Sequence, residues 1–162
     1  MPSASSTTTV RPMTAVDLPA CIDILLGYPW TRYAMTAERA ERVLRSGLNE
    51  GADLRVSEDA EGVSGFLWLV PRGAFYHSGY IRLIGVAQRA KGRGTGRALM
   101  AAAEADTFAV TSDLFLLVSD FNLDAQAFYQ HLGYAQVGVL PDYVLPGNTE
   151  LIFRKRRPET HV

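Results

Sequence analysis

The chain has 162 residues and a formal net charge of −1 at pH 7, with 48% hydrophobic and 20% charged residues. This length suits one domain with one core, and the near balance of charges gives no general reason to expect nucleic acid or a membrane as a partner. Cys21 is the single cysteine, which excludes an internal disulfide and a cysteine-based metal site. We therefore expect a cytoplasmic protein that holds no metal ion.

The two ends of the chain are expected to be tails. The first nine residues have neither a basic nor an apolar segment, and no apolar run is long enough to cross a bilayer. We predict a flexible tail at 1–9, a single domain at 10–157 and a second tail at 158–162.

The first part of the chain predicts two helices and a hairpin. A short extended segment at 10–12 leads into a helix at 15–26, whose apolar residues recur at helical spacing. A second helix is predicted at 36–49, where a threonine supplies the N-cap and a glycine follows the last turn. Strands at 53–58 and 63–70 flank an acidic turn and form a hairpin.

The second part of the chain alternates strands and helices. The predicted strands are 80–87, 114–118, 134–140 and 150–154. The predicted helices are 95–109 and 124–132. A strand, a helix and a strand in crossover order imply a parallel pair within the sheet. The predicted fold class is therefore mixed α+β, with a sheet of six or seven strands and about four helices.

Glycines alternate with basic residues between the strand at 80–87 and the helix at 95–109. The segment reads Lys91, Gly92, Arg93, Gly94, Thr95, Gly96 and Arg97. Alternate glycines let backbone N–H groups converge on an anion, and the following helix directs the positive end of its dipole at the same place. The segment predicts a site for a phosphorylated cofactor, although a basic surface turn that caps the helix has the same composition.

Two common phosphate-binding motifs do not match this segment. A Walker A loop ends in Gly-Lys-Ser/Thr, but here Gly96 is followed by Arg97 and Ala98. A dinucleotide fingerprint needs a third glycine where this chain has Arg97, and it belongs to the first strand and helix of its domain. Both alternatives are therefore excluded.

The same segment resembles the Gln/Arg-x-x-Gly-x-Gly/Ala loop of the GNAT N-acetyltransferase superfamily, which binds the pyrophosphate of acetyl-CoA. The pattern can start at Arg89 or at Lys91. We prefer Lys91, because Leu99 and Met100 then fall where the family has an apolar pair. A lysine at the Gln/Arg position departs from the family pattern.

A second signature of this superfamily is similar to the segment at 116–134. It consists of an apolar strand, then Asn122, then Phe128 and Tyr129, and finally a glycine with an aromatic residue. The resemblance covers about residues 10–155. It implies the GNAT fold, in which a central, mixed and mostly antiparallel sheet splays at the acetyl-CoA site.

The activity that this resemblance implies is acetyl-CoA-dependent N-acetylation. The acceptor is a primary amine of a small molecule or peptide, which attacks directly in a ternary complex. Cys21 lies far from both motifs in sequence, which argues against an acetyl-enzyme intermediate. The alternative is a non-catalytic acyl-CoA-binding sensor or partner-binding module on the same fold. Because dimers are frequent in the superfamily, a homodimer is also an expectation.

The resemblance also implies a set of cofactor-binding residues besides the glycine segment. They are Ile84, Gly85, Val86, Asn122 and Tyr129. The first three would pair with the pantetheine arm, and Gly85 would begin the splay with a bulge. Asn122 would contact the same arm, although it also suits a helix N-cap. Tyr129 would protonate the coenzyme A thiolate, unless it only packs beside Phe128, which we assign to the core.

The general base has no clear candidate in the sequence. Many members of the superfamily place a glutamate on the strand before the loop, but 80–87 contains no carboxylate. His77 is the nearest alternative, since an imidazole titrates in the useful range. Asp120 is a weaker candidate, and Glu104 is expected to face solvent. Proton removal through water and backbone carbonyls remains a further alternative.

The acceptor is expected near the loop between the first two helices and the turn before the last strand. The candidate residues are Tyr28, Trp30, Arg32, Tyr33 and Tyr143. Aromatic rings and an arginine suit a small amine that carries a carboxylate, but the same residues suit the packing of a long loop. The sequence gives neither the acceptor's identity, nor the acyl-chain length, nor the oligomeric state.

Overall fold

The computed structural model describes residues 7–160, which contain seven strands and four α-helices. The strands are β1 (Thr9–Pro12), β2 (Asp53–Asp59), β3 (Gly62–Ala74), β4 (Ser78–Val86), β5 (Asp113–Ser119), β6 (Ala135–Pro141) and β7 (Thr149–Arg156). The α-helices are α1 (Leu18–Leu25), α2 (Ala37–Asn49), α3 (Thr95–Val110) and α4 (Leu123–His131). Short 3₁₀ helices are η1 (Ala15–Asp17), η2 (Trp30–Tyr33) and η3 (Gln88–Ala90).

The strands form one mixed sheet in the order β1-β2-β3-β4-β5-β7-β6. The β4–β5 pair is parallel, and α3 provides the crossover between the two strands. The β1–β2, β5–β7 and β6–β7 pairs are antiparallel. The predicted mixed α+β class, the number of strands and the number of helices are confirmed.

The chain divides into two compact units. Unit 1 holds the residues up to Trp68 together with Leu83–Ala103, and unit 2 holds Leu69–Arg82 together with the residues from Glu104 onward. Strands β3 and β4 and helix α3 contribute to both units. The predicted limits of a single domain at 10–157 stay a prediction.

Both predicted tails lie partly outside the described residues, which leave out 1–6 and 161–162. Thr9, the last residue of the predicted N-terminal tail, instead forms the first residue of β1 and pairs with Glu58. None of the described helices is both long and apolar enough to cross a bilayer.

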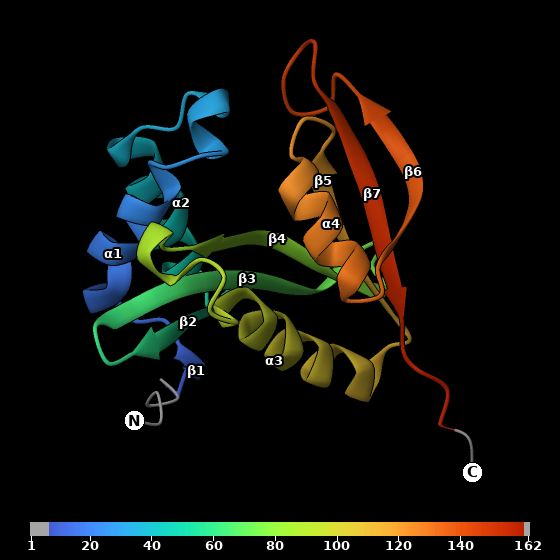
Figure 1. Cartoon of the computed structure of the whole chain (residues 1–162), viewed down its shortest axis with the longest axis horizontal. Helices are drawn as coiled ribbons and strands as arrows, with labels where there is room; N and C mark the ends of the chain where they lie inside the picture. The colour runs from blue at the N-terminus through green and yellow to red at the C-terminus, as the bar shows by residue number, and fades with distance from the viewer. Residues whose placement is uncertain (1–6, 161–162) are drawn as a thin grey trace. The chain divides into compact units, whose positions relative to one another are not determined.

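In unit 1, α1 and α2 pack against each other (Figure 1). The predicted helix at 15–26 is divided into η1 and α1, and Pro19 in the first turn of α1 suits a helix that starts at Leu18. The segment at 27–33, predicted as a loop, contains η2. Helix α2 begins as expected, because the side chain of Thr36 accepts a hydrogen bond from the backbone N–H of Arg39.

Arg11 joins three elements of unit 1 through two carboxylates. Its guanidinium donates to both oxygens of Asp17 at 2.8 Å and to both oxygens of Glu58 at 2.7 and 2.9 Å. Asp17 is 4% exposed and also accepts from the backbone N–H of Thr14. The hydrogen bonds from Arg11 hold the pKa of Asp17 and of Glu58 below their usual values. The network fixes β1 and η1 to β2.

Replacing Asp17 by asparagine is expected to destabilise the fold by about 2 kcal/mol, because a buried, charge-assisted pair is lost. That corresponds to a fall in Tm of about 4–8 °C. The folded-state pKa of Asp17 is lowered, so its contribution is complete above about pH 4 and is lost as the pH falls through the folded pKa. Thermal unfolding at pH 7 and pH 3 checks this: the Tm difference should shrink at pH 3, and an unchanged difference would contradict the assignment.

In unit 2, β5 pairs with β7, and β7 pairs with the edge strand β6 (Figure 1). Helix α4 contacts this sheet through Tyr129, whose ring meets Phe153 of β7 edge to face. Glu104 was expected to face solvent, and this is wrong. Its carboxylate accepts from the Tyr134 hydroxyl at 3.0 Å and from Lys155 Nζ at 2.8 Å, so it is a mostly buried partner of two groups.

Strand β3 is longer than predicted. The strand was predicted to end at Val70, but it continues through Pro71 to Ala74. Phe75 and Tyr76 then form a two-residue turn with φ of 57° and 55°, and the N–H of His77 donates to the carbonyl of Ala74. Turns of this kind favour asparagine and glycine, so the sequence carries no signal for it.

Candidate functional site

The glycine loop before α3 lies in unit 1. Gly92 and Gly94 have φ of +74° and +85°, in the left-handed region that favours glycine. No heavy atom lies within 4 Å of the position that a Cβ would take at either residue. The space on the Cβ side of both glycines is therefore empty, and a ligand can come close to the backbone of the loop there.

Helix α3 starts at the end of this loop and is firmly anchored. The N–H of Ala98 donates to the carbonyl of Gly94 at 3.0 Å, and Leu99 and Met100 are completely buried. Thr95, the first residue of the helix, is 2% exposed. The first turn of a helix has N–H groups without intrahelical partners, and the positive end of the dipole lies there. The loop and the helix start can therefore bind an anion.

The basic residues of the loop differ in their partners. Lys91, Arg93 and Arg97 are exposed. Arg93 lies 3.9 Å from Glu61, whereas no described carboxylate pairs with Lys91 or Arg97. Two positive charges beside the open loop are thus available to an anion.

Arg89, the other possible start of the loop pattern, has a structural role. It donates to both carboxylate oxygens of Asp59 at 3.0 and 2.8 Å and to the carbonyls of Gly62 and Val63. These bonds tie η3 to the turn between β2 and β3, and they lower the pKa of Asp59. Its side chain is occupied, which favours the pattern that starts at Lys91.

Residues Ile84–Val86 form the last part of β4, in unit 1. Gly85 is enclosed: a Cβ there would lie 2.6 Å from Ile24, 2.9 Å from Phe66 and 2.9 Å from the Trp30 ring. Close packing therefore accounts for this glycine. The same contact places Trp30, a predicted acceptor residue, beside the predicted cofactor strand.

The other predicted acceptor residues of unit 1 lie in and around η2. Tyr28 is 50% exposed and Arg32 is exposed, whereas Trp30 and Tyr33 are half-buried. The Tyr33 carbonyl accepts from the Arg39 side chain at 3.2 Å, which fixes this segment to α2. The segment combines packing with an exposed surface, and its role in acceptor binding stays a prediction.

Asn122 lies in unit 2, where β5 ends and α4 begins. Its side-chain oxygen accepts from the N–H of Ala125 at 3.2 Å, so it is the N-cap of α4. Its own N–H donates to the carbonyl of Ser119, and the Gln126 side chain donates to the same carbonyl. The β5–α4 corner, residues 119–126, is thereby held rigidly.

Tyr129 is the most buried aromatic residue of α4. It is 6% exposed, and its ring meets those of Phe128, Tyr134 and Phe153 edge to face. Burial raises its pKa, so the phenol keeps its proton at neutral pH. Phe128, predicted to lie in the core, is only half-buried, because Tyr129 takes the inward position on the helix.

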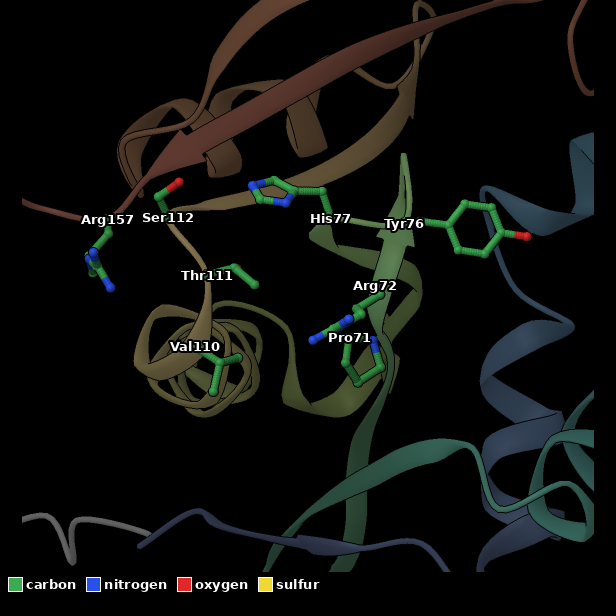
Figure 2. A pocket seen from close by; sticks show the side chains of 8 residues that line it. All are labelled: Pro71, Arg72, Tyr76, His77, Val110, Thr111, Ser112 and Arg157. Carbon is green, nitrogen blue, oxygen red and sulfur yellow. The ribbon is translucent and has the colours of Figure 1, made fainter.

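His77, the predicted base, is exposed and lies in the turn before β4. It lines a cavity of about 360 Å³ in unit 2 with Pro71, Arg72, Tyr76, Val110, Thr111, Ser112 and Arg157. Figure 2 shows His77 beside Ser112, which follows α3, and Arg157, which follows β7. This cavity includes none of the predicted cofactor or acceptor residues, so the position of His77 gives no support to a role as the base.

One buried carboxylate in unit 2 was not predicted. Glu150 is 4% exposed, lies opposite Ser119 in the β5–β7 pair and accepts from its hydroxyl. The only signal in the sequence is an acidic residue at the start of an apolar strand.

Tyr143, in the turn that precedes β7, is 64% exposed. Within residues 7–160, no three His, Cys, Asp or Glu side chains are grouped as metal ligands.

Comparison with known proteins agrees with these features. The sequence matches the Acetyltransferase (GNAT) family over residues 18–134, which include the glycine loop and α4. No curated protein matches the chain.

Several solved structures share the fold at low sequence identity. A GNAT-family acetyltransferase from Bacillus cereus has a TM-score of 0.76 and 18% identity over 94% of this chain and 99% of its own. A ribosomal-protein-alanine N-acetyltransferase from Brucella melitensis has a TM-score of 0.73 and 23% identity over 92% and 99%. An aminoglycoside 6'-N-acetyltransferase complexed with coenzyme A has a TM-score of 0.74 and 15% identity over 93% and 99%. With a family match over more than half of its length, the chain belongs to the GNAT acetyltransferase family.

Proposed function

We propose that this protein is an acetyl-CoA-dependent N-acetyltransferase that acts on a primary amine of a small molecule or peptide. The observation that carries the proposal is the open glycine loop at the start of helix α3, in a chain of the GNAT family. The related aminoglycoside acetyltransferase was solved with coenzyme A. The loop has left-handed glycines and exposed positive charges, and it leads into the first turn of a helix; a pyrophosphate is bound by such features.

The cofactor-binding residues are proposed as two groups. In unit 1, the backbone of Gly92–Gly96 would hold the pyrophosphate, with Lys91, Arg93 and Arg97 around it, and Ile84–Val86 would pair with the pantetheine arm. In unit 2, Asn122, whose amide group also caps α4, is proposed as a further cofactor-binding residue. When bound, acetyl-CoA supplies an acetyl group activated as a thioester.

We propose Tyr129 as the group that stabilises the departing thiolate. Because burial raises its pKa, the phenol is fully protonated at neutral pH and can donate a hydrogen bond to sulfur. A thiol has a pKa of about 8.5, well below that of this phenol, so complete transfer of the proton from the phenol to the thiolate is unfavourable. Tyr129 would therefore act mainly by hydrogen bonding as negative charge develops on the sulfur.

Direct attack of the amine is favoured over an acetyl-enzyme. Cys21 is completely buried in α1, and burial raises its pKa to about 12. A thiol in this state is not a nucleophile at neutral pH. The chain has no other cysteine, which supports a ternary complex of protein, acetyl-CoA and amine.

Replacing Cys21 by alanine is expected to leave kcat within about twofold and to lower stability by about 1 kcal/mol through the small cavity that forms. Steady-state kinetics and thermal unfolding check both numbers. A loss of activity larger than about tenfold, in a variant that still unfolds cooperatively, would favour a covalent mechanism.

The acceptor class is proposed from the exposed aromatic and basic residues. Tyr28, Trp30, Arg32, Tyr33 and Tyr143 are the acceptor-binding candidates. By their names, the structural neighbours act on a ribosomal-protein alanine and on an aminoglycoside. A useful panel of amines is therefore a peptide that starts with alanine, kanamycin, spermidine and free lysine. We further propose that the protein is cytoplasmic and that it forms a homodimer. Light scattering of the purified protein tests the dimer.

An acceptor screen with thiol release as the readout tests the proposed reaction. The expected result is coenzyme A release that depends on both acetyl-CoA and one of these amines. Stabilisation by acetyl-CoA without thiol release from any amine would favour the non-catalytic acyl-CoA-binding module instead. Absence of both effects would contradict the proposed function.

A further inference from the structure

A cavity of about 360 Å³ lies in unit 2, beside the last residues of α3. Three parts of the chain form its walls: the β3–β4 hairpin at 71–77, the α3–β5 connection at 110–112, and Arg157 after β7. None of these residues belongs to the glycine loop, which precedes the other end of α3. Ligand pockets have volumes of roughly 300–1,000 Å³, so this cavity suits a small organic molecule.

Basic side chains line the cavity from two of these three parts. They are Arg72 on β3, His77 in the turn before β4, and Arg157. Figure 2 shows the Arg72 and His77 side chains directed from the hairpin toward the α3–β5 connection. Among the described residues that line the cavity, none carries a carboxylate. The cavity is therefore positively charged, and we expect an anion to bind there.

The basic groups are available to a ligand. Arg72 and His77 are exposed, and no described group pairs with either side chain. The Arg157 guanidinium donates to the Phe108 carbonyl at 2.9 Å, and its backbone N–H donates to the Ser112 carbonyl at 2.7 Å. These two bonds fix Arg157 beside the end of α3, and its guanidinium has further N–H groups for a ligand.

The polar groups next to the cavity are occupied within the protein. Asp113 follows the α3–β5 connection, and its Oδ1 lies 3.9 Å from Arg154 and 3.8 Å from Arg156. Its Oδ2 accepts from the Ser112 hydroxyl at 2.6 Å. The Thr111 hydroxyl donates to backbone carbonyls. The donors that remain for a ligand are therefore the guanidinium and imidazole N–H groups.

The hairpin that carries two of these donors is held in an unfavourable conformation. Phe75 and Tyr76 have φ of 57° and 55°, which residues with large side chains rarely adopt. The Phe75 ring meets that of Phe115 on β5 edge to face, which fixes the hairpin to the sheet. Tyr76 is 93% exposed, so burial of its ring does not offset the strain. Strain of this kind is concentrated at functional positions.

The number and type of the donors favour a phosphate over a carboxylate. A phosphate monoester carries a charge of about −1.5 to −2 at pH 7 and has three acceptor oxygens. A carboxylate carries one charge on two oxygens. Guanidinium groups bind phosphate through two parallel hydrogen bonds. Pro71 and Val110 add apolar surface to the same cavity, which an organic group can contact.

We propose that this cavity binds a small phosphate monoester. Arg72 and His77 bind the phosphate, Arg157 adds positive charge from the end of β7, and the organic group lies against Pro71 and Val110. The site is separate from the glycine loop and does not depend on the proposed acetyltransferase function.

An NMR titration of the ¹⁵N-labelled wild-type protein with phenyl phosphate tests the proposal. The amide signals of His77, Thr111, Ser112 and Arg157 should shift together and give one Kd below about 1 mM. Inorganic phosphate lacks the organic group, and benzoate lacks the second charge. Each should therefore bind at least about fivefold more weakly. Equal affinity for either compound would overturn the assignment of a phosphate monoester.

Two arginine variants locate the binding site. Arg72 is exposed, so Arg72→Gln should keep the fold, and the Kd for phenyl phosphate should rise by about tenfold or more. Arg156→Gln is the matched control, because Arg156 precedes Arg157 but does not line the cavity. Its Kd should stay within about twofold of the wild-type value. An equal loss in both variants would show binding by general surface charge and overturn the proposal.

The same titration separates this site from the glycine loop. Shifts confined to Gly92, Gly94 and their neighbours would overturn the proposal while favouring the loop as a phosphate site. A lack of saturable shifts at about ten times the expected Kd would overturn it as well. Neither result contradicts the proposed acetylation, which the thiol-release screen tests on its own.

Discussion

Replacing Tyr129 by phenylalanine is expected to lower kcat by about 10²-fold while the affinity for acetyl-CoA changes little. The substitution removes only the hydroxyl, and the ring contacts with Phe128, Tyr134 and Phe153 remain. Because burial raises the pKa of Tyr129, the wild-type rate should show no loss from ionisation of this phenol up to about pH 10. Steady-state kinetics between pH 7 and pH 10 measure both effects.

Tyr134→Phe is the matched control for this experiment. Tyr134 is also buried in the aromatic cluster, but its hydroxyl donates to Glu104. Its loss should lower stability by about 1–2 kcal/mol and leave kcat within about threefold. Tyr129→Phe should thus mainly lower the rate, whereas Tyr134→Phe should mainly lower the stability. Equal kinetic effects would remove Tyr129 from the mechanism.

Replacing Gly94 by glutamate is expected to abolish the stabilisation that coenzyme A gives in thermal unfolding. A side chain there projects into the open space of the loop, and its negative charge repels the pyrophosphate. The φ of +85° adds backbone strain of about 1–2 kcal/mol, which lowers Tm even without ligand. The ligand-dependent shift is therefore the informative quantity.

Gly51→Glu separates these two effects. Gly51 follows α2, has a φ of +73° and is equally open on its Cβ side. The variant carries the same strain and charge in unit 1 but lies outside the loop. Its Tm without ligand should fall by a similar amount, and its shift with coenzyme A should equal that of the wild type. A full shift in Gly94→Glu would rule out the loop as the pyrophosphate site.

Local signals explain how much of the fold could be predicted. Helix α2 was predicted at both ends because its N-cap, Thr36, and the glycine after it act within a few residues. The end of β3 was predicted wrongly, because Phe75 and Tyr76 adopt left-handed conformations that their side chains disfavour. Neither residue favours such a turn by itself, so composition alone could not indicate it.

In the candidate site, too, features with a local cause could be predicted and features that depend on distant residues could not. The open backbone at Gly92 and Gly94 follows from glycine itself, so the sequence indicated it directly. The hydrogen bonds of Arg89 and Glu150 are made with partners far along the chain: Asp59 is 30 residues from Arg89, and Ser119 is 31 residues from Glu150. Such partners meet only in the folded sheet, which is why Glu150 was not predicted.

The central claim, that the glycine loop binds acetyl-CoA, is tested most directly by thermal unfolding of the wild-type protein with and without acetyl-CoA. At a ligand concentration about a hundred times Kd, the gain is about 2.7 kcal/mol, which corresponds to a rise in Tm of about 5–10 °C. The account predicts this rise, together with its loss in Gly94→Glu and its retention in Gly51→Glu. No rise at millimolar acetyl-CoA would contradict it.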